Sequence, residues 1–132
     1  MKKKGVTLVE TIVSLMILMV IITLFVTLVE DYTINLKARI TKEKLSRLSY
    51  CIMNELKYNY TKEDILLLTD DNKIELKNYD EIMEDLKYKN LFQLDRGNGI
   101  TILFNDTNEN LEIKVSIYED GFIEERDFVK WR

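Results

Sequence analysis

The sequence predicts an α+β protein in which one long N-terminal helix packs against a small antiparallel β-sheet. Three observations support this fold class. The run from Val6 to Val29 contains a single charged residue, Glu10, and no Gly or Pro. Apolar residues then continue at helical spacing to Tyr60, again without Gly or Pro. The last third of the chain alternates apolar and polar residues between turn signals, as antiparallel strands with one buried face do.

The apolar run is long enough to cross a membrane. At about 1.5 Å per residue it extends roughly 36 Å as a helix, and a hydrocarbon core is about 30 Å thick. Three lysines, Lys2, Lys3 and Lys4, precede the run, and Glu30 and Asp31 follow it. This asymmetry predicts a single pass of the cytoplasmic membrane with the N-terminus inside and the rest outside. A cleaved secretory signal is disfavoured because no Ala-x-Ala pattern follows the run; Ala38 is the only alanine.

Glu10 is the unusual residue of this run. An ionisable side chain there costs on the order of 3 kcal/mol, so it is expected to have a partner or a function. A carboxylate in such a run is tolerable when it meets an opposite charge in low dielectric and is costly when it does not. Thr7, Glu10, Thr11 and Ser14 share one helical face, a polar stripe suited to helix packing in lipid.

The residues Lys2-Lys3-Lys4-Gly5, then Val6-Thr7-Leu8-Val9-Glu10 and a long apolar stretch, resemble the N-terminus of type IV prepilins and pseudopilins. The resemblance is dense from Met1 to about Val29. It implies that a prepilin peptidase cuts between Gly5 and Val6 and methylates the new N-terminus at Val6. Glu10 would become the fifth residue of the mature chain, four residues or roughly 6 Å of helix rise from the new amine. Glu10 could pair with its own amine or with that of a neighbouring subunit, and the resemblance implies the neighbour. The sequence departs from many family members by having Val6, where they have Phe, after the cut.

These observations divide the chain into four parts. Residues 1–5 are the predicted leader, 6–29 the transmembrane part of the helix, 30–60 its amphipathic part, and 61–132 a globular α+β domain. The amphipathic part has one apolar stripe, formed by Ile34, Ala38, Leu45, Leu48, Ile52 and Leu56. Arg39, Glu43 and Arg47 on the opposite side are spaced for i,i+4 ion pairs. Cys51 is expected to be a small buried residue of the core.

The C-terminal part shows local signals for each element. Thr61 with Asp64 predicts a capped short helix to about Leu68, and Lys73–Lys77 a brief strand. Asn78 with Glu81 predicts a second helix start, with Ile82, Met83 and Leu86 on its buried face. Ile100–Phe104 and Leu111–Tyr118 are predicted strands. Asp120-Gly121 predicts a tight hairpin into Phe122–Val129, whose charges suit an edge strand. Because 61–132 is small and has no disulfide, the sheet is expected to need the helix stripe as its cover.

Composition excludes several classes of function. Histidine is absent, which removes the commonest general base and metal ligand, and the single cysteine permits no intrachain disulfide. The formal net charge of −4 and the lack of a basic cluster disfavour a nucleic-acid surface. No catalytic residue, cofactor or metal site is expected, and the protein is predicted not to be an enzyme.

Two functions remain. The first is a structural subunit, a minor pilin rather than the major one, of a type IV pilus or related pseudopilus. Its partners would be prepilin peptidase, other pilin subunits, the pilus assembly platform and the membrane, and after assembly it would lie at the cell surface or in the pilus. The second is a single-pass signal-anchored extracellular binding protein. The systems that the resemblance implies serve motility, adhesion, secretion or DNA uptake.

Overall fold

The structure, a computed structural model, describes residues 8–69, 71–107 and 110–131. Their elements, in chain order, are α1 (Leu8–Tyr58), α2 (Lys62–Leu68), β1 (Lys73–Lys77), α3 (Ile82–Tyr88), the 3-10 turn η1 (Leu91–Gln93), β2 (Gly99–Asp106), β3 (Asn110–Glu119) and β4 (Phe122–Trp131). The predicted fold class is confirmed: a long N-terminal helix packs on an antiparallel sheet. Contacts divide the chain into two compact units, Met1–Arg39 and Ile40–Arg132. We call the second unit the head.

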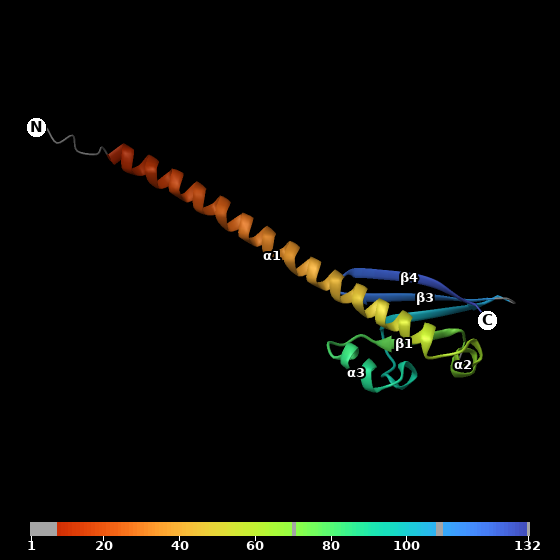
Figure 1. Cartoon of the computed structure of the whole chain (residues 1–132). Coiled ribbons are helices and arrows are strands. Elements are labelled where there is room, and N and C mark those ends of the chain that lie inside the picture. The colour runs from red at the N-terminus through yellow and green to blue at the C-terminus, as the bar shows by residue number, and fades with distance from the viewer. Residues whose placement is uncertain (1–7, 70, 108–109, 132) are drawn as a thin grey trace, which may run out of the picture. The chain divides into compact units, whose positions relative to one another are not determined.

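The sheet of the head has four strands in the order β1-β2-β3-β4, and every neighbouring pair is antiparallel (Figure 1). In its centre Ile102 is opposite Val115, and Val115 is opposite Arg126. The predicted hairpin at Asp120-Gly121 is confirmed, since both residues have positive φ (49° and 80°) and connect β3 to β4 directly. Positive φ at both central positions defines a two-residue turn whose twist matches the strands. The edge position predicted for β4 is also confirmed.

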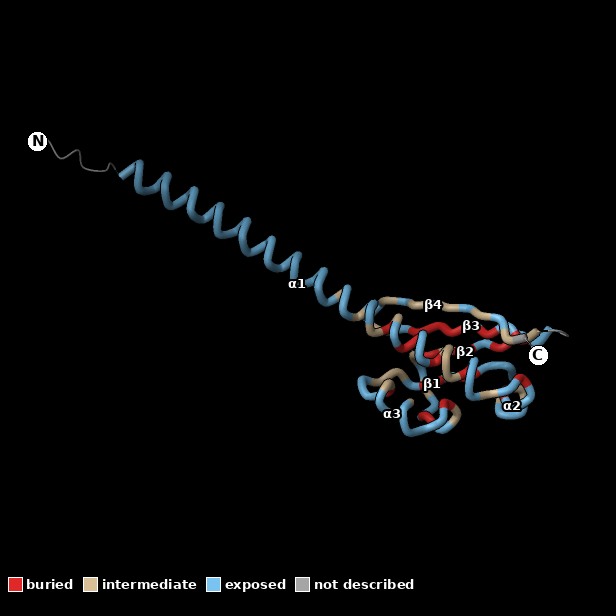
Figure 2. Tube along the Cα trace, in the orientation of Figure 1, coloured by how far each residue is buried: buried red, intermediate tan, exposed pale blue. Residues whose placement is uncertain are grey.

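The core lies between the C-terminal part of α1 and the inner face of the sheet. Leu45, Leu48, Ile52 and Leu56 of α1 are at most 1 % exposed, as their spacing predicted. They meet the inward side chains of the strands: Ile74, Leu76, Ile100, Ile102, Leu111, Ile113, Val115 and Ile117. In Figure 2 these buried segments appear red.

The buried part of α1 is shorter than the predicted apolar stripe. Ile34, the first member of the predicted stripe, is 64 % exposed and precedes the head, and Ala38 is only partly buried. The prediction that Cys51 is a buried core residue is wrong, because its thiol-bearing side chain is exposed. Cys51 directly precedes the buried Ile52, and one helical residue is a rotation of about 100°, which turns Cys51 away from the sheet.

The short helices follow their sequence signals in part. Thr61 and Asp64 form the predicted capping box of α2: the Thr61 hydroxyl accepts from Asp64 N–H, and the Asp64 carboxylate accepts from Thr61 N–H (2.9 Å). The start predicted for α3 at Asn78 is wrong, since α3 has Glu81 as its N-cap without a side-chain cap. The Asn78 amide instead donates to Glu119 (3.1 Å) at the end of β3. Because Glu119 is far from Asn78 in the sequence, no local pattern could predict this hydrogen bond.

Lys130 of β4 anchors the C-terminal end of α1. Its ammonium donates to the backbone carbonyl oxygens of Leu56 (2.8 Å), Lys57 (3.0 Å) and Tyr60. The last carbonyls of a helix have no partner within the helix, so a cation here satisfies them and favours the helix dipole. Partial burial lowers the pKa of Lys130, and the carbonyl oxygens compensate for this loss of hydration.

We expect Lys130→Met to destabilise the head by about 1–3 kcal/mol, because hydrogen bonds from a charged group are lost and the carbonyls at the end of α1 lose their donor. Amide hydrogen exchange of β3, measured on the full chain in detergent, reports this global stability. Lys114→Met is the matched control, because Lys114 is half-exposed and pairs with Glu125 at the surface (3.0 Å). Equal effects of the two substitutions would contradict the anchoring role.

Candidate functional site

The N-terminal part of α1 is long and apolar enough to cross a membrane, and it is the one helix in the described residues with this property. None of its most apolar segment is buried within the protein (0 %), which distinguishes it from the core helix of a soluble protein. Figure 2 shows this part of α1 pale blue, the colour of exposed residues. The protein therefore presents a long apolar helix that has no covering surface among the described residues of its own chain.

Between Leu8 and Thr33, the serine and threonine hydroxyl groups of α1 donate to carbonyl oxygens of the helix itself. Ser14 donates to Glu10 O (2.7 Å) and Thr11 to Leu8 O (2.8 Å). Further along α1 the same contact is made by Thr23 to Met19 O (2.9 Å), Thr27 to Leu24 O (2.9 Å) and Thr33 to Val29 O (2.8 Å). A hydroxyl that donates to the preceding turn loses little when it leaves water. Thr11 and Ser14 thus need no second helix to satisfy their donors.

Glu10 lies in α1, near the beginning of the described residues, and is exposed. Gly5 and Val6, predicted to form the cleavage and methylation site, lie outside the described residues, as do the leader lysines Lys2, Lys3 and Lys4 and the stripe residue Thr7. The roles predicted for all of these residues stay predictions.

In the head, a polar cluster connects three elements that are distant in the sequence. Lys44 of α1 forms ion pairs with Asp80, which precedes α3 (2.8 Å), and with Glu119 at the end of β3 (2.8 Å). Two hydrogen bonds raise the pKa of Lys44, and the bond to Asp80 has a larger effect than the bond to Glu119. The same contact lowers the pKa of Asp80. Sequence reasoning missed this cluster because its members are 36 and 75 residues apart and share no local pattern.

The cluster makes the stability of the head depend on pH. Because the folded-state pKa of Asp80 lies below the ordinary value of 3.8, its pairing stabilises the head above that pH and is lost as the pH falls through the folded-state value. We expect the melting temperature to fall less steeply on acidification in Asp80→Asn than in the unmodified protein. Circular dichroism melts over a pH series measure this slope. Asp71→Asn removes the same charge elsewhere, and an equal slope in both variants would contradict the assignment.

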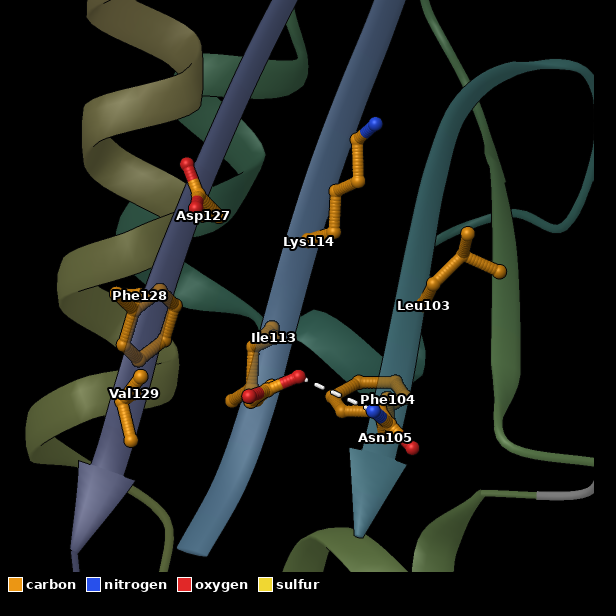
Figure 3. Close-up of a pocket in the computed structure, with 9 residues that line it drawn as sticks. Leu103, Phe104, Asn105, Ile113, Lys114, Asp127, Phe128 and Val129 are labelled. Carbon is orange, nitrogen blue, oxygen red and sulfur yellow. Dashed lines mark hydrogen bonds between the residues drawn. The ribbon is translucent and has the colours of Figure 1, made fainter. Parts of the chain in front are cut away.

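The outer face of the sheet has a shallow depression of about 420 Å³. Leu103, Lys114 and Asp127 form one row across its strands, and Asn105, Glu112 and Val129 form the next (Figure 3). Asn105 donates to Glu112 within the second row (3.0 Å). The surface combines apolar and charged side chains, and it offers contacts to a partner rather than a nucleophile with an adjacent base.

No group of three or more His, Cys, Asp or Glu in the described part of the chain is arranged to hold a metal ion. Comparison with protein-family models, with curated proteins and with solved structures found no match to this chain.

Proposed function

We propose that this protein is a structural subunit of a type IV pilus or a related pseudopilus, with the character of a minor pilin. The proposal rests on the Gly5-Val6 junction and on Glu10, which lies in a helix whose apolar part is exposed from Leu8 to Val29. Such a helix needs lipid before assembly and other helices after it. The small acidic head, Val6 and the unbroken helix favour a minor subunit.

Processing would convert this helix into an assembly element. Prepilin peptidase would remove Met1–Gly5 on the cytoplasmic side and methylate Val6, leaving a positive amine at the end of the helix. Glu10 would pair with the amine of a neighbouring subunit, because a carboxylate in an apolar environment is costly unless it meets an opposite charge. This pairing would set the axial register of subunits taken up by the assembly platform, with the heads outside the membrane.

The mass of the mature N-terminus tests the proposal. The full chain is expressed with and without a prepilin peptidase, and its N-terminal peptide is measured by mass spectrometry. We expect loss of Met1–Gly5 and one added methyl group on Val6 only when the peptidase is present. A Gly5→Asp variant, in which the residue at the cut is changed, is the control and should stay uncut. An uncut native chain would leave the alternative function, a signal-anchored binding protein that uses the outer face of its sheet.

We expect Glu10→Ala to insert into the membrane normally but to be depleted from fibres by roughly tenfold or more, since each pairing site would lose its carboxylate. Immunoblots of membranes and of sheared fibres measure the two fractions separately. Glu30→Ala is the matched control, because Glu30 is an exposed acid at the far end of the apolar run. Normal incorporation of Glu10→Ala would refute the pairing while leaving processing intact.

A further inference from the structure

The two edges of the sheet differ in how their backbone groups are satisfied. Beyond the five-residue β1, the segment Asp95–Gly97 covers the edge: Lys77 N–H donates to Asp95 O (2.9 Å), and Gly97 N–H donates to Glu75 O (3.3 Å). At the other edge, β4 is ten residues long and is last in the strand order. In the described part of the chain, no strand pairs with β4 on the side away from β3.

The backbone groups that remain free on β4 follow from its register. Glu119 and Phe122 flank a two-residue turn, so they form a hydrogen-bonded pair, and such pairs alternate with non-hydrogen-bonded ones along antiparallel strands. The N–H and C=O groups that point away from β3 therefore belong to Ile123, Glu125, Asp127 and Val129. All four residues are exposed, and Ile123 and Val129 are 61 % and 41 % exposed. This edge is a free hydrogen-bonding ladder, the feature that extended polypeptides recognise.

A second copy of β4 would bring like charges together at this edge. In a continuous sheet, residues that are opposite each other on neighbouring strands point to the same face. When two copies of β4 pair antiparallel with two-fold symmetry, the axis therefore passes through one residue, which lies opposite its own copy. Each centre from 124 to 128 brings like charges together: Glu124, Glu125, Arg126 or Asp127 meets its own copy, or Arg126 meets Lys130. Like charges directly opposite are destabilising. Centres 125 and 127 also place Glu124 opposite Arg126 or Lys130, so these two centres are the least unfavourable. The like-charge contacts disfavour self-pairing, and the dimerisation outcome of the test below distinguishes a second copy from a different strand.

The charge pattern also specifies the strand that would fit. On the outer face, Glu125 and Asp127 are two carboxylates beside one cation, Lys114. On the inner face, Arg126 is occupied by Glu124 (3.2 Å) and by the Ser46 hydroxyl of α1 (2.6 Å). We propose that the free edge of β4 binds an extended segment of a different protein as a fifth strand, and that this segment carries basic residues at alternate positions, flanked by apolar ones.

α1 limits what the segment can carry on its other face. The contacts of Ser46 with Arg126, of Lys42 with the Phe122 ring (5.5 Å) and of Lys130 with the end of α1 place this helix along the inner face of β4. Figure 3 shows α1 running beside β4. Side chains of the added strand that point inward would meet α1, so small residues are expected there. The inference does not depend on the proposed role in a fibre, because it concerns only the head.

A peptide of matched design tests the edge. The probe is acetyl-Thr-Val-Thr-Lys-Thr-Lys-Thr-Val-Thr-amide with a fluorescent label, titrated into the full chain in a zwitterionic detergent and followed by anisotropy. We expect saturable binding below millimolar concentration and slower amide exchange along β4. The same peptide with Glu in place of both Lys should bind with an affinity at least about tenfold lower, because two cross-strand attractions become repulsions.

Val129→Pro separates ladder pairing from simple charge attraction. Proline removes an N–H that points away from β3, so the β3–β4 pairing stays intact, as exchange of β3 amides will verify. We expect Val129→Pro to abolish binding and Val129→Ala, which keeps the N–H, to retain it. Equal binding by Val129→Pro, equal binding of a scrambled peptide with adjacent lysines, or no saturable binding would overturn the proposal. Dimerisation of the chain that Val129→Pro abolishes would also overturn it, in favour of a second copy.

Discussion

We expect a fragment that begins at Thr61 to stay unfolded, whereas a fragment that begins at Glu30 folds cooperatively. Leu45, Leu48, Ile52 and Leu56 are at most 1 % exposed and form one side of the core. Burial of such a side chain contributes about 1.5–3 kcal/mol, and the net stability of a domain is only about 5–15 kcal/mol. Loss of all four side chains therefore removes stabilisation of the same size as the whole net stability of the head, so the remaining contacts cannot keep it folded.

Circular dichroism and urea titration of both fragments measure this difference. The Glu30 fragment should show a single sharp transition and strand signal, and the Thr61 fragment should show neither. A third fragment that begins at Ile40 is the control, since the compact head begins there, and it should resemble the Glu30 fragment. A cooperative transition in the Thr61 fragment would refute a core shared between α1 and the sheet.

Much of this fold could be predicted because its signals are local. The capping box of Thr61 and Asp64 spans three residues, the Asp120-Gly121 turn needs only two residues that tolerate positive φ, and the inner face of β3 alternates along a single strand. The contacts that fix α1 against the sheet could not be predicted. Lys44 with Glu119, and Lys130 with the end of α1, join residues more than seventy positions apart. Periodicity identifies a face that needs cover but not the residues that supply it.

The candidate functional site divides in the same way. The apolar run and Glu10 are visible in the sequence because length, hydropathy and one charge suffice to recognise them. The free edge of β4 could be predicted only as a charged edge strand, since its open ladder depends on the strand order and on the segment that covers β1. The direction in which each backbone group points follows from the turn register, which becomes definite only when the turn and the strand pairs are known.

We expect Ile52→Ala to destabilise the head by about 2–5 kcal/mol and Ile34→Ala to change its stability by less than about 0.5 kcal/mol. The two residues belong to the same predicted stripe and undergo the same chemical change. Ile52 is fully buried (0 % exposed), so truncation removes apolar contact and leaves a cavity, whereas Ile34 is 64 % exposed. Amide exchange of β3 in the full chain in detergent measures both effects on one scale.

The comparison isolates burial from helix propensity, because both substitutions place alanine in the interior of α1 and alter its propensity equally. Equal destabilisation by the two variants would mean that residues before Ile40 stabilise the head, against its division from the preceding unit. A small effect of Ile52→Ala would mean that the sheet is stable without this contact, and the expected failure of the Thr61 fragment would then lose its basis. A large effect confined to Ile52 leaves the exposed part of the stripe, with Ile34, available for contacts outside the head.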